Sequence, residues 1–236
     1  MSISPVLPDV CPRAVLLDYD GTLVDTEPYW MQVEIDVMNS FGVPWGMDDA
    51  RQLCGTSREY SLAVQFAQLA AHGVDLATVD VDAFYEQLCQ GVIDAVEQHG
   101  LTWLPGAREL LADLRATGTP CAVVSNSPTS VLTSGLRQFP DGAISAVVDG
   151  DVVSAGKPDP EGYRLAAAML GVDAADCIVV EDTRSGAEAG LAAGAVVVTV
   201  PGQFDVPDLP GVVKVPGLAG LTTARLREIF AEERGA

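Results

Sequence analysis

The sequence predicts an α/β protein, in which a doubly wound parallel sheet forms the core and an all-helical segment is inserted after the first strand. Three observations lead to this prediction: short apolar runs that end in polar residues, helical patterns between the runs, and one long stretch with helical periodicity only. A chain of 236 residues, 48% of them hydrophobic, is large enough for such a core and a smaller second domain.

The strands are predicted from continuous apolar runs. Residues 14–18, 121–125, 177–182 and 195–200 form such runs, and residues 146–153 are a fifth candidate, broken by Gly150. Runs of β-branched residues without polar alternation are typical of strands that are buried on both faces of a parallel sheet.

Helix-start and helix-end signals lie between these runs. Asp159, followed by proline, is typical of a helix N-terminus. Ser185 and Glu188 have the spacing of a capping box, which predicts an alanine-rich helix that ends near Gly194. Strands that alternate with helices indicate right-handed crossovers and a Rossmann-like sheet, in which ligands bind beyond the carboxyl ends of the strands.

Residues 28–103 interrupt this alternation, because they contain several helical stretches and no strand pattern. We therefore predict a catalytic core domain formed by residues 1–27 and 104–236, and an inserted helical cap domain formed by residues 28–103. Apolar residues at helical spacing in this insert are expected to form its own core.

Composition limits the classes of partner. The formal net charge is −20, from 33 acidic and 13 basic residues, so binding to nucleic acid or to an anionic membrane is not expected. The five cysteines form no CxxC pair, no signal-peptide pattern precedes the first strand, and the longest apolar stretch is too short to span a bilayer. We expect a cytoplasmic monomer or weak homodimer that acts on a small molecule.

Acidic residues follow two of the predicted strands. Asp18 and Asp20 stand in the segment DYDGT, and Glu181 and Asp182 follow a later strand. Parallel strands place both segments at one edge of the sheet, and carboxylates that close together repel each other unless a cation compensates. Oxygen-only ligands favour Mg²⁺. An Asp-rich turn with no metal is the simpler reading of DYDGT taken alone.

Two further segments predict a phosphate site. The chain has only two lysines, and Lys157, in a loop before a capped helix, is placed to offset negative charge beside the carboxylates, whereas Lys214 is not. Ser125 and Asn126 follow the second strand and precede a helix N-terminus, which is a good cradle for phosphate oxygens. In isolation, Lys157 would be read as a solvated surface lysine, and Ser125 and Asn126 would also fit a plain N-cap signal.

Taken together, these segments resemble the haloacid dehalogenase superfamily of phosphohydrolases. The likeness is closest to its helical-cap branch, which contains β-phosphoglucomutases and sugar-phosphate phosphatases. It runs from about residue 14 to 200 and includes the segments LVDTE, PGARELLADLRATG, GKPDPEGY and VVEDTRSGAEAGLAAGA.

The resemblance implies roles for the candidate residues. Asp18 would be the nucleophile and Asp20 the general acid and base, while Ser125 and Lys157 would hold the transferring phosphoryl group. Mg²⁺ would be bound by the Asp18 carboxylate, the Asp20 backbone carbonyl and Asp182, with Glu181 acting through water. The expected substrate-binding residues are Gly21, Asn126, Gly55 and Arg58.

The main alternative within this family is a β-phosphoglucomutase. The segment GTSREY (55–60) resembles the mutase cap loop, in which an arginine matching Arg58 grips the non-transferring phosphate. Trp30, however, stands where the mutases carry a histidine, and the predicted cap contains no lysine, so hydrolysis of a phosphomonoester is favoured.

Other reaction and protein classes fit less well. A dehalogenase typically lacks the second aspartate, and Schiff-base phosphonate cleavage needs a cap lysine. A two-component receiver domain uses similar residues in the reverse order and lacks the insert. A catalytically dead scaffold would be expected to lack some of the chemical residues, all of which are present.

Overall fold

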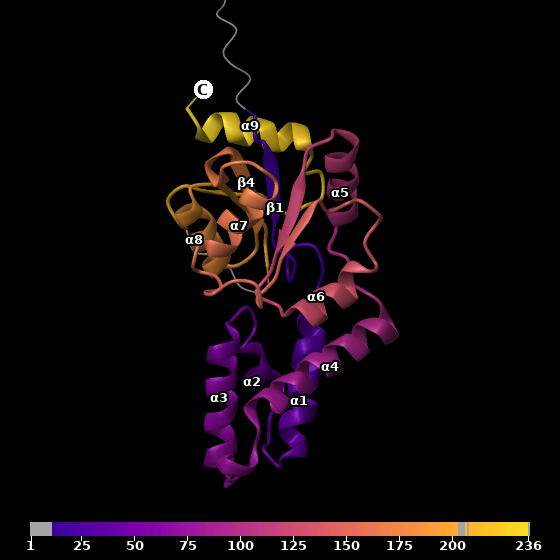
Figure 1. Ribbon diagram of the computed structural model, residues 1–236, viewed down its shortest axis with the longest axis vertical. Coiled ribbons are helices and arrows are strands. Elements are labelled where there is room, and N and C mark those ends of the chain that lie inside the picture. Colours follow the sequence, from indigo (N-terminus) through magenta and orange to yellow (C-terminus); the bar gives the residue numbers. More distant parts are fainter. Residues whose placement is uncertain (1–10, 203–205, 207, 236) are drawn as a thin grey trace, which may run out of the picture.

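The computed structural model describes residues 11–202, 206 and 208–235, so residues 1–10 of the predicted core domain lie outside the described part. Its centre is a parallel six-stranded sheet in the order β3-β2-β1-β4-β5-β6 (Figure 1). The strands are β1 (Ala14–Leu17), β2 (Cys121–Val124), β3 (Ala146–Val148), β4 (Cys177–Glu181), β5 (Val196–Thr199) and β6 (Val212–Lys214). The predicted doubly wound α/β core is confirmed.

The central strand β1 pairs with β2 on one side and with β4 on the other. Leu17 is in register with Val123 of β2 and with Val180 of β4. Every residue of β1, β2, β4 and β5 is buried, as expected for strands covered on both faces. The polar residues that follow β1, β2 and β4 therefore leave the sheet side by side.

The two outer strands differ from the sequence prediction. The candidate strand at 146–153 ends at Val148, because the chain then turns and the Gly150 N–H donates a hydrogen bond to the carbonyl of Ser127. The prediction for residues 149–153 was therefore wrong. Strand β6 was not predicted, since it has only three residues and none of them is fully buried.

Helices cover both faces of the sheet. Helices α5 (Ala107–Ala116), α6 (Thr129–Leu136) and α9 (Thr223–Glu233) pack on the face that carries Val15 and Leu17. Helices α7 (Glu161–Met169) and α8 (Arg184–Ala193) pack on the opposite face, which carries Ala14 and Leu16. Alternate residues of β1 thus contribute to two separate apolar layers.

The caps of α7 and α8 differ in part from the predicted ones. The carboxylate of Asp159 accepts a hydrogen bond of 2.9 Å from the backbone N–H of Glu161, but the N-cap position of α7 is Pro160. Helix α8 is capped by Thr183 and not by Ser185, while Glu188 pairs with Arg184 instead of closing a capping box. The predicted capping box was wrong, because β4 ends early enough for Thr183 to cap first. Gly194 ends α8 in the left-handed conformation, as predicted.

The helical insert consists of α1 (Glu27–Ser40), α2 (Met47–Arg51), α3 (Arg58–Ala71), a 3₁₀ turn (Leu76–Thr78) and α4 (Val81–His99). These helices lie together at one end of the molecule, away from α9, and share an apolar cluster around Met38, Leu69 and Phe84 (Figure 1). Helix α4 also packs against α6 of the core, with Val92 and Val96 near Val131. The predicted inserted helical cap is confirmed as part of the fold class.

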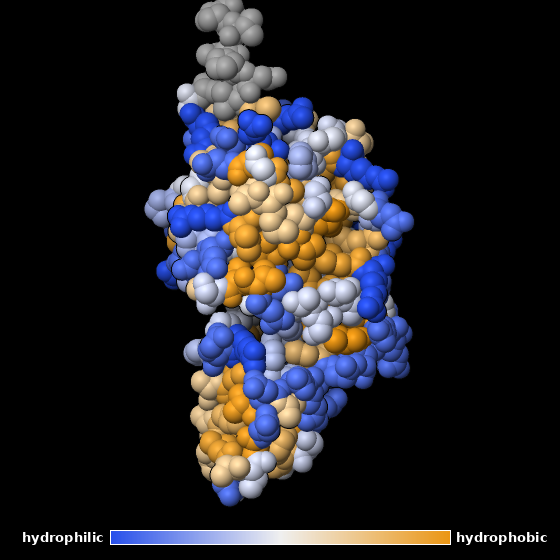
Figure 2. All heavy atoms as spheres, viewed as in Figure 1, coloured by the Kyte–Doolittle hydropathy of each residue, from blue (hydrophilic) through white to orange (hydrophobic). Residues whose placement is uncertain are grey.

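The surface reflects this division. On the face in Figure 2, hydrophobic residues gather over the middle of the core and on the helical cap, while hydrophilic residues line much of the outer edge. No helix in the described part of the chain is long and apolar enough to cross a membrane. The carboxyl ends of the central strands face the cap, so a ligand bound there lies between the two parts.

Candidate active site

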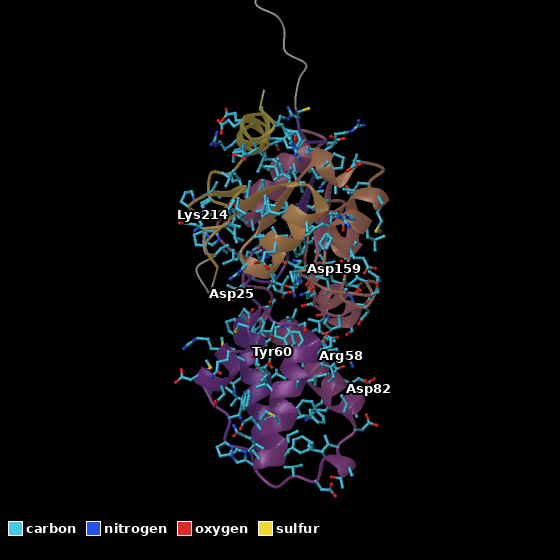
Figure 3. The ribbon with its side chains drawn as sticks, turned by 90° about the vertical axis from the view of Figure 1, so that its left-hand side faces the viewer. Asp25, Arg58, Tyr60, Asp82, Asp159 and Lys214 are labelled. Atoms are coloured by element: carbon cyan, nitrogen blue, oxygen red, sulfur yellow. The ribbon has the colours of Figure 1, made fainter. Side chains whose placement is uncertain are left out.

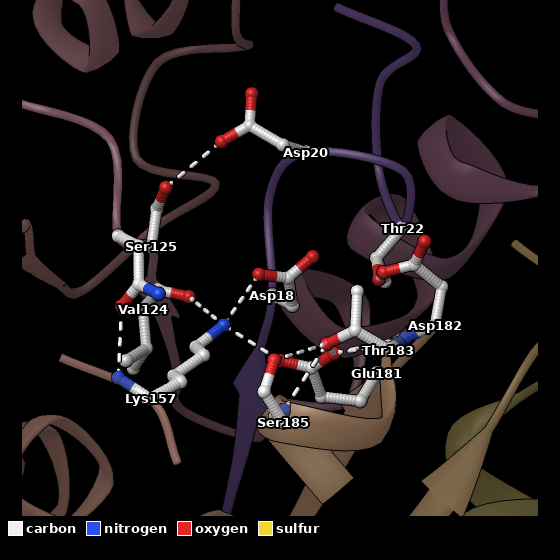
Figure 4. A network of polar contacts seen from close by, with 12 residues as sticks. Asp18, Asp20, Thr22, Val124, Ser125, Lys157, Glu181, Asp182, Thr183 and Ser185 are labelled. Carbon is white, nitrogen blue, oxygen red and sulfur yellow. Dashed lines mark hydrogen bonds and ion pairs between the residues drawn. The ribbon is translucent and has the colours of Figure 1, made fainter. Parts of the chain in front are cut away.

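Four loops meet at the carboxyl ends of the central strands (Figure 4). Asp18 directly follows β1, and Ser125 directly follows β2. Glu181 ends β4 and is followed by Asp182, and Lys157 comes from the loop that precedes α7. Since β1 lies between β2 and β4, Asp18 is the central residue of this group.

Lys157 joins three of these loops. Its Nζ lies 2.5 Å from Oδ1 of Asp18 and 2.6 Å from Oε1 of Glu181, and it also donates to the carbonyl of Val124 at 2.9 Å. The Lys157 backbone N–H donates to Oδ1 of Asn126 at 3.0 Å, which fixes the loop. The side chain of Lys157 is 7% exposed, so its ammonium group is held in a largely dry environment.

Glu181 is completely buried and fully hydrogen-bonded. Its Oε1 accepts from the hydroxyl of Tyr163 at 2.7 Å as well as from Lys157, and its Oε2 accepts from the backbone N–H and hydroxyl of Thr183. A methyl group on Gly186 would lie 1.8 Å from Oε1, so this close approach of α8 requires glycine. In this arrangement Glu181 fixes the position of the Lys157 ammonium group.

The protonation states follow from burial and charge. Burial opposes ionisation of Glu181, but the attraction and hydrogen bonds of Lys157 hold its pKa below the ordinary value. Burial likewise disfavours the Lys157 ammonium, yet Asp18 and Glu181 raise its pKa above the usual range. Burial and then the Glu181 charge raise the pKa of Asp18 to about 7. Burial and then the Asp18 charge raise the pKa of Asp182 to about 9.

The raised pKa values of Asp18 and Asp182 reflect their burial and the negative charge of the neighbouring carboxylates. Among the described residues, Asp18, Glu181 and Asp182 form a cluster in which one carboxylate oxygen of each lies within 4.8 Å of the others. Oδ2 of Asp18 is buried without a hydrogen-bond partner. A cluster of three carboxylates, one of which has an oxygen without a hydrogen-bond partner, fits a divalent cation such as Mg²⁺. Gly21, with φ +82°, lets the loop pass close to Asp182.

Asp20 lies apart from this three-carboxylate cluster. Its Oδ2 accepts hydrogen bonds from Ser125 at 2.9 Å and Ser127 at 2.7 Å, and its Oδ1 accepts from Thr26. The side chains predicted to converge as four carboxylates therefore meet as three. A metal contact of Asp20 through its backbone carbonyl stays a prediction, and Ser125, predicted to hold a phosphoryl group, here orients Asp20.

The site opens into a cavity of about 120 Å³ between core and cap. Asp18, Asp20 and Lys157 line its core side, together with the predicted substrate residue Asn126. Two predicted substrate residues from the cap, Gly55 and Arg58, line it as well. Gly21 is not among the described residues that line the cavity; it lies against Asp182 instead.

Arg58 is already engaged with other cap residues. Its guanidinium donates to Oδ1 of Asp82 at 2.9 Å and lies over the ring of Tyr85, at 4.1 Å from the centroid. Figure 3 shows Arg58 and Asp82 close together in the cap near its boundary with the core, and Lys214 on a flank of the core. Lys214 ends the edge strand β6, which β4 and β5 separate from β1, and pairs there with Asp208 at 2.6 Å.

Several residues at this site were missed from the sequence. Thr26 and Ser127 lie within the segments LVDTE and SNS, so their hydroxyl groups were within view in the sequence, but their hydrogen bonds to Asp20 were not predicted. Glu34 and Gln65 lie on helices at some distance from any motif, whereas Tyr163 ends the segment GKPDPEGY but was given no role. Only the packing of α7, α1 and α3 brings them to the site.

The fold and this site define an α/β enzyme with a helical cap and a carboxylate–lysine centre. The family model for haloacid dehalogenase-like hydrolases matches residues 12–194. The chain is 32% identical to hexitol phosphatase A of Escherichia coli (strain K12) over 208 residues, which cover 84% of this chain and 87% of that protein. It is 33% identical to a phosphoglycolate phosphatase of Pseudomonas putida over 193 residues, covering 80% and 69% of the two chains.

Among solved structures, the chain is similar to a β-phosphoglucomutase from Clostridium difficile. The TM-score is 0.78 at 21% identity, and the match covers 95% of this chain and all of that one (100%). At this identity the likeness shows the fold alone. The match to the family model and the identity to the two phosphatases show that the chain belongs to the haloacid dehalogenase-like hydrolases.

Proposed function

We propose that this enzyme is a magnesium-dependent phosphatase that hydrolyses a small phosphomonoester through a phosphorylated Asp18. The observation that carries the proposal is the position of Asp18 at the end of the central strand, with Nζ of Lys157 2.5 Å from its Oδ1 and a cavity in front of it. Membership of the hydrolase family and the phosphatase relatives identify the chain as a phosphoric monoester hydrolase.

In the first step, a carboxylate oxygen of Asp18 attacks phosphorus, and the bond from phosphorus to the ester oxygen breaks. Asp20 donates a proton to the departing oxygen, which leaves as an alcohol. The hydrogen bonds from Thr26, Ser125 and Ser127 hold the Asp20 carboxyl group beside the cavity for this transfer.

In the second step, Asp20 takes a proton from a water molecule, whose oxygen attacks phosphorus. The bond between Asp18 and phosphorus breaks, inorganic phosphate is released and the Asp18 carboxylate is restored. Lys157 offsets the negative charge on the phosphoryl oxygens in both steps, and Glu181 keeps the lysine in place.

A bound Mg²⁺ would be held by Asp18, Asp182 and the Asp20 backbone carbonyl, and it would withdraw charge from the phosphoryl oxygens. The buried, unpaired Oδ2 of Asp18 supports this assignment. Both carboxylate oxygens of Glu181, predicted to reach the metal through water, already accept hydrogen bonds from the protein, so we assign Glu181 the positioning of Lys157. We also propose residues 28–103 as the cap domain, residues 1–27 with 104–236 as the core domain, and a small phosphorylated metabolite in the cytoplasm as the substrate.

A mutase of the β-phosphoglucomutase type begins with the same phosphorylated aspartate, but it must exclude water and hold a second phosphate in the cap. The described cap offers Arg51 and Arg58 as its arginines, and Arg58 already pairs with Asp82. Trp30 lines the cavity at the position where a mutase histidine was expected. These observations favour hydrolysis.

The deciding assay supplies β-glucose 1-phosphate with a trace of the 1,6-bisphosphate and follows glucose 6-phosphate and free phosphate together. A phosphatase that accepts this ester releases one phosphate for each substrate consumed. Rapid formation of glucose 6-phosphate with negligible free phosphate would overturn the proposal and favour the mutase. A panel of about a hundred phosphorylated metabolites would then identify the physiological substrate.

A further inference from the structure

The cavity in front of Asp18 continues into the cap, where its wall is built by α1 and α3. Glu34 comes from α1 and Gln65 from α3, and both line the same cavity as Asp18 and Lys157. If the phosphoryl group occupies the core side, as the proposed function requires, the alcohol part of the substrate extends towards these two side chains.

Both side chains are buried, and each has polar atoms without a hydrogen-bond partner in the part of the chain that the structure describes. Gln65 is 0% exposed, and neither its Oε1 nor its Nε2 is hydrogen-bonded. Glu34 is 6% exposed, and its Oε2 is likewise unpaired. An unpaired polar group in a protein interior costs free energy, and folded proteins retain few of them. Two such groups on the wall of one cavity indicate that a ligand supplies the missing partners.

The charges around the cavity indicate what kind of ligand fits. Among the described lining residues, Lys157 and Arg58 are the cationic ones, and both are already in ion pairs. Glu27 and Glu34 add carboxyl groups to the cap side. A carboxylate or a second phosphate on the leaving group would lie beside these carboxyl groups and would find no free cation among the described lining residues to compensate its charge.

Hydroxyl groups match the same wall. A hydroxyl both donates and accepts, so it can donate to Oε2 of Glu34 or Oε1 of Gln65 and accept from Nε2 of Gln65.

We infer that Glu34 and Gln65 bind hydroxyl groups of the leaving alcohol, and that the enzyme selects phosphomonoesters of uncharged polyhydroxylated alcohols over esters that carry a carboxylate or a second phosphate. This inference rests on the proposed phosphatase function. It assigns substrate selection to two positions in the cap and makes the 2-phosphoglycolate type of substrate a poor one.

The test measures kcat/KM with Mg²⁺ for three esters: sorbitol 6-phosphate, 2-phosphoglycolate and p-nitrophenyl phosphate. For the wild-type enzyme, kcat/KM for sorbitol 6-phosphate should exceed that for 2-phosphoglycolate at least about tenfold. Gln65→Leu and Glu34→Met should each lower the ratio of sorbitol 6-phosphate to p-nitrophenyl phosphate by about tenfold or more. Gln68→Leu and Asp36→Asn, exposed positions on the same two helices, should leave that ratio unchanged.

Thermal melting controls for the fold. Because the Gln65 amide has no hydrogen-bond partner among the described residues, Gln65→Leu should melt at or above the wild-type temperature, and a clear drop would show a structural role and count against the inference. Unchanged ratios in both cavity variants, or a wild-type preference for 2-phosphoglycolate, would overturn it. If the wild-type enzyme releases no phosphate from any ester, the proposed function itself is wrong.

Discussion

Oε1 of Glu181 lies 2.6 Å from Nζ of Lys157, and this buried pair sets the position of the cation beside Asp18. Glu181 is 0% exposed and receives further hydrogen bonds from Tyr163 and Thr183, so its own position is fixed by β4, α7 and α8. The lysine therefore reaches Asp18 from a rigid support, which favours stabilisation of charge that develops during phosphoryl transfer.

The first prediction compares the two lysines of the chain. Lys157→Ala should lower kcat/KM for a hydrolysed ester at least about 300-fold, because it removes the cation that faces the phosphoryl oxygens. Lys214→Ala should change it by less than about twofold, since Lys214 pairs with the exposed Asp208 at the end of the edge strand β6. Equal effects of the two substitutions would show that Lys157 is misassigned.

The second prediction concerns Tyr163, whose hydroxyl donates to Glu181 in the interior. Tyr163→Phe should lower the free energy of unfolding by about 1–3 kcal/mol, because it removes a hydrogen bond to a buried carboxylate. Tyr60→Phe, at a tyrosine that is 57% exposed, should change it by less than about 0.5 kcal/mol. Urea unfolding of the two variants measures the difference, and similar values would contradict a structural role for the Tyr163 hydroxyl.

The third prediction is a strict requirement for Mg²⁺. Dialysis against EDTA should abolish turnover and Mg²⁺ should restore it, because Asp18, Glu181 and Asp182 otherwise hold uncompensated negative charge. Ca²⁺ should fail to support turnover, since it prefers larger and less regular coordination than Mg²⁺. Undiminished phosphate release in excess EDTA would argue for a metal-free reaction.

The fourth prediction uses the pH dependence of stability. Burial and then the Glu27 charge raise the pKa of Glu34 from 4.5 to about 8, so the folded state favours the protonated form. The contribution of Glu34 to stability is therefore fully present below about pH 4.5 and is lost as the pH rises towards 8. Glu34→Gln removes the titrating carboxyl group at this position. The free energy of unfolding of the variant relative to that of the wild type should therefore increase between pH 5 and pH 8, by at most about 1.4 kcal/mol per pH unit.

Melting curves in EDTA at several pH values measure this change, with the exposed Asp36→Asn on the same helix as the control. The other buried carboxyl groups are present in all three proteins, so the comparison isolates Glu34. A difference between Glu34→Gln and wild type that stays constant with pH would mean that Glu34 titrates normally in the fold.

The core of the fold was predictable because its signals are local. Strand β1 and its two neighbours are short, continuous apolar runs that are buried throughout, and the polar residues at their ends mark the site. Strand β6 was not predictable in this way, since its three residues are partly or fully exposed. The start of α8 was misplaced because Thr183 and Ser185 are both competent N-caps, and only the end of β4 decides between them.

The site was predictable to the extent that its residues follow strands. Asp18 and Asp182 leave adjacent strands of a parallel sheet, so their proximity follows from topology. Tyr163, Glu34 and Gln65 lie on helices, and the face that each helix turns towards the site depends on tertiary packing. The polar side chains of Glu34 and Gln65 carry no signal in the sequence that separates them from solvated residues, whereas Tyr163 ends the segment GKPDPEGY.

The central claim is that Asp18 becomes phosphorylated during turnover. Asp18→Asn should reduce phosphate release by several orders of magnitude while the circular dichroism spectrum stays that of the wild type. That loss alone would also follow from damage to metal binding, so the phosphorylated residue must be identified directly.

The most direct measurement is an acid quench of wild-type enzyme turning over a ³²P-labelled ester, followed by borohydride reduction and mass spectrometry of the peptides. Reduction of an aspartyl-phosphate converts the modified residue to homoserine. We expect transient protein-bound label, and homoserine at position 18 only. Release of phosphate with no protein-bound label, or with homoserine at position 20 instead of 18, would contradict the mechanism.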